Sequence, residues 1–170
     1  MVSEKILAEF NEQVKHEFFS ANYYLAMAAY CKHLELEGFA NFFIVQAEEE
    51  RFHAMKFFSF INEIGGRAYI TALDEPKNDF ETLEEVFAAA LKHEEFVTDR
   101  INHLMDIAVN EKNYACVSFL SWFVDEQVEE LTTMGSLLTK VKRIGEQSHA
   151  IYMLDAELAQ RTFTPPTAEK

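Results

Sequence analysis

Four segments of the chain carry an apolar stripe at helical spacing, and in each segment polar side chains interrupt the stripe near its middle. The apolar residues step by three and four positions within about residues 7–28, 39–64, 83–108 and 117–141. Such a stripe is typical of a helix that packs one face into a core. The interrupting residues are Glu17, Glu50 with His53, Glu94, and Gln127.

These interruptions are costly unless something compensates them. An ionised carboxylate in an apolar core costs several kcal/mol unless it is paired or bound to a cation. Helices of similar length that pack side by side place their midpoints at one level, so the interrupting side chains should share one layer of the core. Three carboxylates, an imidazole and an amide in one layer predict a metal centre.

Turn signals predict where the helices begin and end. Ser3 is a suitable N-cap, Gly38 marks a break in a short loop, and Gly65-Gly66 is a strong C-terminal signal. We expect residues 1–160 to form one domain and residues 161–170, with Pro165-Pro166, to form a disordered tail. The expected helices cover residues 3–33, 39–64, 81–111, 114–143 and 147–160.

The lengths of the connections predict the topology. Short loops join the first helix to the second and the third to the fourth, so each pair should form an antiparallel hairpin. Residues 67–80, between the hairpins, are long for an unstructured loop in a compact domain. They are well suited to span the length of a bundle, which makes the second and third helices parallel. The predicted fold is all-α: a four-helix bundle with one long crossover and a short fifth helix.

Charge and composition limit the partners and the compartment. The net charge of −14 argues against nucleic acid and anionic membranes, and it fits either cations or a merely solvated acidic surface. No apolar run approaches the roughly 20 residues that a membrane span needs. The N-terminus lacks the pattern of a signal peptide. Cys31 and Cys116 have no C-x-x-C partner and are expected as buried thiols, so we expect a cytoplasmic protein.

The types of donor narrow the choice of metal. Glu50 and His53 form a Glu-x-x-His pair, which projects two ligands from one helix face. Carboxylate oxygens with one imidazole suit iron or manganese better than a metal that prefers thiolates. Two ions are favoured over one, because the negative charge of the donors exceeds what one divalent ion neutralises.

A second acidic set lies beside this layer in the sequence. It is either a third, weaker cation site between the core and the outside, or a solvated acidic face. Its members are Glu49, Glu126, Glu129 and Glu130.

Tyrosine, glutamine, tryptophan and histidine side chains near the layer could act on the metal ligands or serve only the packing of the core. Tyr24, two turns after Glu17, is either a core tyrosine or a hydrogen-bond donor to a ligand carboxylate that can give up one electron. Gln46 is a satisfied core amide or a donor to a ligand, and Trp122 is expected to pack beside the core. The remaining histidines are expected on the surface or at an edge: His16, His33, His93, His103 and His149.

Over about residues 4–160 the chain resembles the non-haem ferritins of bacteria and archaea. The motifs that carry the resemblance are Asn11-Glu12-Gln13 with Glu17, Glu48-Glu49-Glu50-Arg51-Phe52-His53, Lys92-His93-Glu94, and the run from Phe119 to Glu130. The resemblance implies a ferritin-like shell of 24 subunits. Such a shell oxidises Fe(II) with O2 or H2O2 at a diiron centre in each subunit and stores ferric mineral inside.

The resemblance also implies a role for each candidate residue. The first iron would bind to Glu17, Glu50 and His53, with Glu50 bridging to the second iron. Glu94 and Glu130 would hold the second iron, with Gln127 close to it. The remaining positions match a third iron site, Glu49, Glu126, Glu129 and Glu130, and a tyrosine beside the centre, Tyr24.

Two sister families fit less well. Bacterioferritins carry a second Glu-x-x-His on the fourth long helix, where this chain has Gln127-Val128-Glu129-Glu130, and their haem-ligating methionine falls at Arg51. We therefore expect no haem. Rubrerythrins add a four-cysteine iron domain, which two isolated cysteines cannot supply. The alternatives to a ferritin are a small diiron peroxidase or oxygenase that forms no shell, and a bundle whose polar residues only set helix register.

Overall fold

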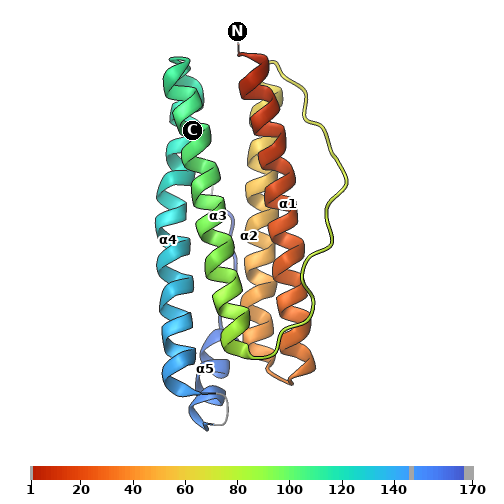
Figure 1. The fold of residues 1–170 in the computed structure, drawn as a ribbon, viewed down its shortest axis with the longest axis vertical. Helices are drawn as coiled ribbons and strands as arrows, with labels where there is room; N and C mark the ends of the chain where they lie inside the picture. The colour runs from red at the N-terminus through yellow and green to blue at the C-terminus, as the bar shows by residue number, and fades with distance from the viewer. Residues whose placement is uncertain (1, 146–147, 167–170) are drawn as a thin grey trace.

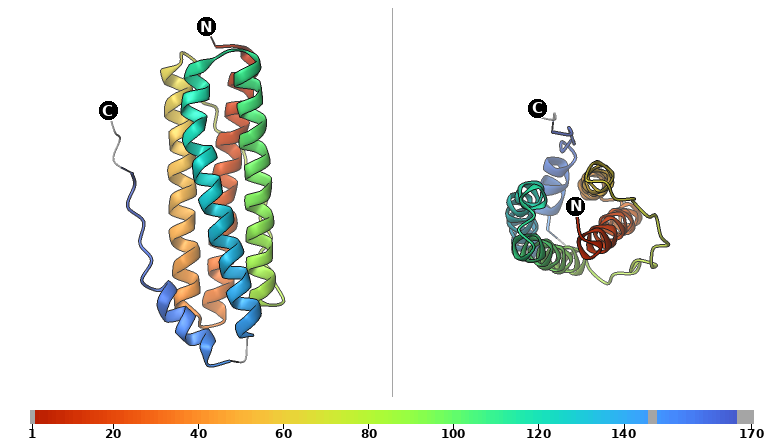
Figure 2. Two further views of the ribbon diagram at one scale, coloured as in Figure 1. Left: turned by 90° about the vertical axis from the view of Figure 1, so that its left-hand side faces the viewer. Right: turned by 90° about the horizontal axis from the view of Figure 1, so that it is seen from above.

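The structure is a computed structural model that describes residues 2–145 and 148–166. Within these ranges the chain forms five helices (Figure 1). The helices are α1 (Glu4–His33), α2 (Glu37–Glu63), α3 (Leu83–Asn110), α4 (Tyr114–Ile144) and α5 (Ala150–Leu158). The first four lie side by side as a bundle, and α5 packs across one end (Figures 1 and 2). The predicted four-helix bundle with a short fifth helix is confirmed. No helix within the described ranges is long and apolar enough to cross a membrane.

Capping side chains fix the starts of three helices. Ser3, Thr82 and Asn113 each accept a hydrogen bond from the amide three residues later, at 3.1, 3.0 and 3.2 Å. Each bond satisfies one of the amides that the first turn leaves free. At the other end of α2, Gly65 takes a left-handed φ of 84°, as its predicted stop signal requires.

The predicted break at Gly38 is wrong. Helix α2 begins at Glu37, so Gly38 lies in its first turn and is buried. The reason is a close approach between helices: a Cβ at Gly38 would overlap the backbone carbonyl oxygen of Asp155 on α5. The Asp155 side chain also accepts a hydrogen bond from the Phe39 amide at 2.9 Å. The glycine therefore makes room for α5.

The fifth helix is shorter than predicted. It runs from Ala150 to Leu158, whereas residues 147–160 were expected. The expected start at residue 147 lies outside the described residues.

We expect Gly38→Ala to destabilise the subunit by about 1–3 kcal/mol, because an added methyl group must push α5 away from α2. Gly135→Ala is the matched control, since Gly135 is also helical but has nothing within 4 Å of the added Cβ. That change should be neutral or stabilise by up to about 1 kcal/mol. Denaturant titration of both variants checks this, and equal effects would show that α5 does not depend on the glycine.

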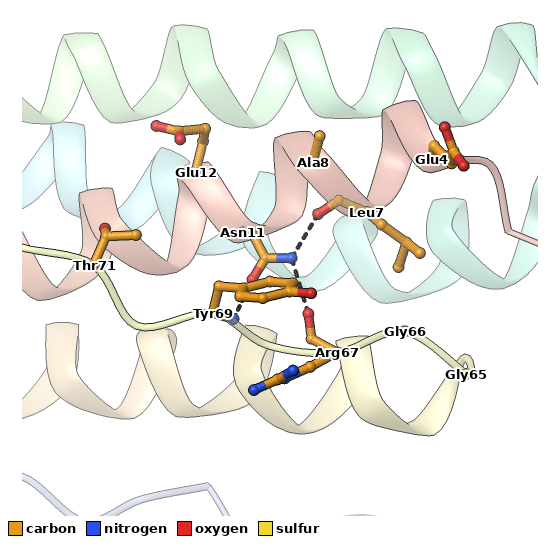
Figure 3. A pocket seen from close by; sticks show the side chains of 10 residues that line it. All are labelled: Glu4, Leu7, Ala8, Asn11, Glu12, Gly65, Gly66, Arg67, Tyr69 and Thr71. Atoms are coloured by element: carbon orange, nitrogen blue, oxygen red, sulfur yellow. Dashed lines mark hydrogen bonds between the residues drawn. The ribbon is translucent and has the colours of Figure 1, made fainter.

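The crossover follows α1 along the length of the bundle (Figure 1). Residues 67–80 have no regular secondary structure, and they bring the chain back so that α2 and α3 run parallel, as predicted. Asn11 on α1 fastens its start (Figure 3): its side chain donates to the Arg67 carbonyl at 3.2 Å and accepts from the Tyr69 amide at 2.7 Å. A pocket of about 670 Å³ opens beside this contact, and none of the candidate ligands lines it.

Polar residues divide the core into two apolar clusters. One cluster includes Tyr24, Ala47, Ala90 and Met134, and the other includes Val14, Phe57, Val97 and Phe123. Between these positions along each helix lie the predicted interruptions, and all are buried: Glu17, Glu50, His53, Glu94 and Gln127. The prediction that the interruptions share one level of the bundle is confirmed.

Helix α4 is rotated about its own axis relative to the orientation that its apolar stripe predicted. Leu131 and Leu138, both expected in the core, are only half-buried, whereas Glu130 and Leu137 are buried. The turn brings the Glu130 carboxylate inward, where it accepts a hydrogen bond from Gln46 at 2.7 Å. Helix α4 therefore adds a carboxylate to the polar layer as well as the amide of Gln127.

Candidate metal centre

Three ligand-type side chains converge between α1 and α2. Glu17, Glu50 and His53 each offer one ligand atom, and these atoms all lie within 4.8 Å of one another. All three side chains are at most 3% exposed. The Glu-x-x-His spacing on α2 places Glu50 and His53 on one helix face, and the packing of α1 against α2 brings Glu17 to them.

Two oxygens of this cluster have no hydrogen-bond donor. Oε2 of Glu17 and Oε2 of Glu50 are buried without a partner, while the other oxygen of Glu17 accepts from Gln13 Nε2 at 2.9 Å. No lysine or arginine of residues 2–145 and 148–166 forms an ion pair with either carboxylate. Leaving a buried acceptor unsatisfied costs about 1–3 kcal/mol, which a cation on these oxygens would remove. The residues therefore fit a cation that prefers oxygen and imidazole ligands, as iron and manganese do.

Glu94 on α3 is held by a donor on each carboxylate oxygen. Tyr24 on α1 donates its hydroxyl proton to Oε1, and Gln127 on α4 donates its amide to Oε2 at 3.1 Å. The Tyr24 ring is stacked on Phe43, with ring centroids 6.0 Å apart. Tyr24 is therefore both a buried core residue and a hydrogen-bond donor to a candidate ligand, so the two interpretations of its position hold together.

Glu130 on α4 is the fourth buried carboxylate of the layer. Its hydrogen bond from Gln46 shows that this amide is a donor to a candidate ligand. Burial, together with the nearby charge of Glu94, raises the pKa of Glu130 to about 8. Glu130 lies one helical turn after Gln127, which donates to Glu94, on the same face of α4.

Burial also governs the charge of the other carboxylates. It raises the pKa of Glu17 and of Glu50 well above the usual range, and the carboxylates nearby raise both further. Burial raises the pKa of Glu94 too, although the hydrogen bonds from Tyr24 and Gln127 lower it. Without a cation the pKa of Glu130, about 8, favours its protonated form near neutral pH, and a metal ion must displace that proton to bind there.

The outer acidic set does not converge as one group. In the described chain, Glu17, Glu50 and His53 are the only group of three metal-ligand side chains within 4.8 Å. Glu126 lies 3.9 Å from His53 Nε2, Glu129 is exposed, and Glu49 forms an ion pair with Arg161 at 2.7 Å. His53 therefore lies between the buried layer and the outer carboxylates, because its Nδ1 faces Glu50 at 3.6 Å.

The prediction that His93 lies on the surface or at an edge is wrong. His93 is buried, and its Nε2 lies 2.7 Å from the Ser20 hydroxyl of α1. Its ring meets the Tyr23 ring edge-on, with centroids 5.3 Å apart. Burial lowers its pKa to about 4, so it is neutral near pH 7. Its partner Ser20 lies on α1, so the sequence of α3 alone does not reveal this contact.

Two residues beside the site had no predicted role. Gln13 supports Glu17, and its position four residues earlier on the same helix is a signal that could have identified it. Arg161 pairs with Glu49 from the segment that was predicted to be a disordered tail. No pattern in the sequence points to that contact.

Comparison with known proteins agrees with this geometry. A family model described as a ferritin-like domain matches residues 7–144. The bacterial non-heme ferritin of Staphylococcus aureus (strain USA300) is 47% identical over 163 residues, which is 96% of this chain and 98% of that protein. The bacterial non-heme ferritin of Staphylococcus saprophyticus is 45% identical over the same shares.

Solved structures give the same result. An engineered closed form of the Archaeoglobus fulgidus ferritin superposes with a TM-score of 0.94 at 41% identity, covering 96% of this chain and all of that one. The open-pore ferritin of the same organism has a TM-score of 0.94 at 40% identity, covering 95% of this chain and all of that one. The resemblance inferred from the sequence motifs is thereby confirmed. The chain belongs to the ferritin family and, within it, to the non-haem ferritins of bacteria and archaea.

Proposed function

We propose that this chain is a ferroxidase subunit of an iron-storage shell. Iron storage follows from membership of the ferritin family, and the ferroxidase step is our inference from the site. The observation that carries it is the cluster of Glu17, Glu50 and His53, with two buried carboxylate oxygens that no donor satisfies. Fe(II) is the substrate whose ligand preference matches these donors.

Two ions per centre are proposed. The first Fe(II) binds to Glu17, Glu50 and His53, and the second binds to Glu94 and Glu130, with Glu50 bridging the two. Gln127 donates a hydrogen bond to Glu94 and Gln46 donates one to Glu130, so each amide fixes the position of one carboxylate ligand of the second ion. Hard anionic oxygens stabilise the trivalent ion more than the divalent one, so this ligand set favours oxidation.

The electrons go to O2 or H2O2. Two Fe(II) ions give one electron each to O2, which takes up two protons and leaves as H2O2; with H2O2 as oxidant, two electrons and two protons give two water molecules. A proton that Fe(II) displaces from Glu130 is available for this uptake, and solvent supplies the rest. The two Fe(II) ions supply both electrons for either oxidant, and Tyr24, hydrogen-bonded to Glu94, holds that carboxylate in place.

Fe(III) then leaves toward the outer acidic set. We propose that Glu49, Glu126 and Glu129 act together with Glu130 as a weaker third site. His53 has one ring nitrogen facing Glu50 and the other facing Glu126, so it adjoins both sites. The product hydrolyses and collects as ferric mineral inside a shell of 24 copies of the chain, in the cytoplasm.

Size-exclusion chromatography tests the shell. We expect a particle of several hundred kDa from 19.7 kDa chains, with iron in the same fractions after exposure to Fe(II) and air. A dimer that oxidises iron without retaining it would instead identify a small diiron peroxidase or oxygenase. A protein that takes up no metal would leave only the structural bundle.

A further inference from the structure

The chain that follows α5 is fastened along α2. Asn41 on α2 donates its side-chain amide to the backbone carbonyls of Leu158 at 3.1 Å and Arg161 at 3.0 Å. Figure 2 shows the segment after α5 lying beside α2. This path carries Arg161 and Phe163 toward the outer acidic set.

Arg161 is packed on three sides. Its guanidinium lies over the Phe42 ring, 4.4 Å from the centroid, and Nη1 donates to the Phe42 carbonyl at 3.4 Å. Nη2 donates to Glu49 Oε2 at 2.7 Å. The side chains of Arg161 and Glu49 are 24% and 17% exposed, so water screens this pair less than it screens a pair on the open surface. A planar guanidinium that is stacked and paired in this way is well ordered.

Phe163 continues the same path. Its ring meets Phe52 edge-on, with centroids 5.8 Å apart, and Phe52 in turn meets Trp122 at 6.3 Å. The Trp122 ring lies 5.4 Å from the His53 ring. The segment therefore passes beside the residues through which the buried layer adjoins the outer carboxylates.

We propose that the Arg161 guanidinium competes with a cation for the Glu49 carboxylate. A metal ion then binds the outer acidic set only as the segment after α5 is released. A guanidinium and a metal ion on one carboxylate repel each other strongly in a partly buried site. By linkage, the ion that weakens the Arg161 contact must itself bind more weakly while that contact is intact. The proposal rests on the proposed function in one respect, namely that Glu49 helps to hold a cation.

The competition has a consequence for storage. While Arg161 occupies Glu49, the outer set has one carboxylate fewer for the ion, and iron is favoured at the buried cluster. Once the outer set is loaded, the segment loses its anchor at Glu49. Arg161 would thus set the order in which the two sites fill.

Terbium(III) luminescence tests this without iron oxidation. Trp122 is the only tryptophan, and it lies one helical turn before Glu126, so it can sensitise a terbium ion bound at the outer set. In the assembled, metal-free protein, Arg161→Gln should tighten terbium binding on the order of 5- to 50-fold, the range of a typical coupling between sites. Arg161→Lys, which keeps the charge but loses the planar stack, should fall between.

Two further variants serve as controls. Arg143→Gln makes the same change of charge at an exposed arginine on α4 and should leave the affinity unchanged. Glu49→Gln should weaken terbium binding, and Arg161→Gln should then have no further effect. Unchanged elution volume and helix content in every variant establish that the fold is kept.

The outcomes separate the inference from the function on which it rests. If terbium binding depends on Glu49 but Arg161→Gln equals the wild type, the competition is overturned and the outer site stands. If Arg143→Gln tightens binding as much as Arg161→Gln, the effect is one of bulk charge and the competition is again overturned. If Glu49→Gln changes nothing in either background, both the competition and the role of Glu49 in the third site are overturned.

Discussion

Replacing Glu50 with glutamine should lower the initial rate of Fe(II) oxidation on the order of 100-fold or more. Loss of a partner that merely supports a metal ligand typically costs 10–100-fold, and Glu50 is proposed as the ligand shared by both ions. Glutamine keeps the shape of the side chain but supplies no negative charge. Stopped-flow absorbance after mixing the metal-free protein with Fe(II) and O2 measures the rate.

The same substitution should stabilise the metal-free protein. Burial and the charges of Glu94 and Glu130 oppose ionisation of Glu50, and one of its oxygens has no donor. At neutral pH a carboxyl with a raised pKa must either take up a proton on folding or remain ionised in the core. Both cost free energy, on the order of 1 kcal/mol or more, that a neutral glutamine of similar volume avoids. Calorimetry without metal should therefore show a higher Tm for Glu50→Gln than for the wild type.

Glu48→Gln is the matched control, because Glu48 is a neighbouring glutamate on α2 that is exposed. It should leave both the rate and the Tm close to those of the wild type. A Glu50→Gln protein that keeps the wild-type rate would contradict the ligand assignment. A lower Tm would instead show that the Glu50 carboxylate is already satisfied in the metal-free fold.

The second large effect is the pH dependence of stability in the absence of metal. Burial raises the pKa of Glu130 from 4.5 to about 8, and it raises those of Glu17, Glu50 and Glu94 in the same direction. The folded state then binds more protons than the unfolded state, so stability present below the unfolded pKa is lost as pH rises toward the folded pKa. His93 acts oppositely, because its pKa is lowered from 6.5 to about 4 and its contribution is lost only as pH falls below 6.5.

Between pH 6.5 and 8 the change in stability therefore reports the buried carboxylates and not His93. Over that window the metal-free protein should lose about 1–2 kcal/mol per subunit through Glu130, at up to about 1.4 kcal/mol per pH unit, and the raised pKa values of the other buried carboxylates act in the same direction. Excess Zn(II) should reverse the trend, since a metal ion binds more tightly as protons leave its ligands. Calorimetry at both pH values, with and without Zn(II), measures the change. Glu130→Gln should flatten the slope, and a wild-type stability that rises with pH in the absence of metal would contradict the buried protons.

Helical periodicity was enough to predict the bundle and the level of the site. The stripes of four long helices specify which faces pack. Because side-by-side helices of similar length place their midpoints at one level, Glu17, Glu50, Glu94 and Gln127 are expected in one layer without knowledge of helix contacts, and all four are buried. The same periodicity predicted the rotation of α4 less well. The predicted stripe placed Leu131 and Leu138 in the core, whereas the fold buries Glu130 and Leu137.

Three features that the sequence did not predict depend on contacts between distant parts of the chain. Gly38 is equally suited to a loop and to a close approach of helices, and the position of α5 decides which applies. His93 is buried against α1, where its ring lies within hydrogen-bond distance of Ser20, 73 residues earlier. Arg161 reaches Glu49 only because α5 turns the chain back along α2. No local pattern encodes any of these contacts.

Storage of iron after oxidation at the buried centre is tested most directly by anaerobic titration with Fe(II), exposure to air, and measurement of the iron that stays with the protein. We expect the retained iron to exceed three ions per subunit many times over and to elute with a particle of several hundred kDa. Retention of no more than two or three ions per subunit would contradict storage, even if every ion had been oxidised.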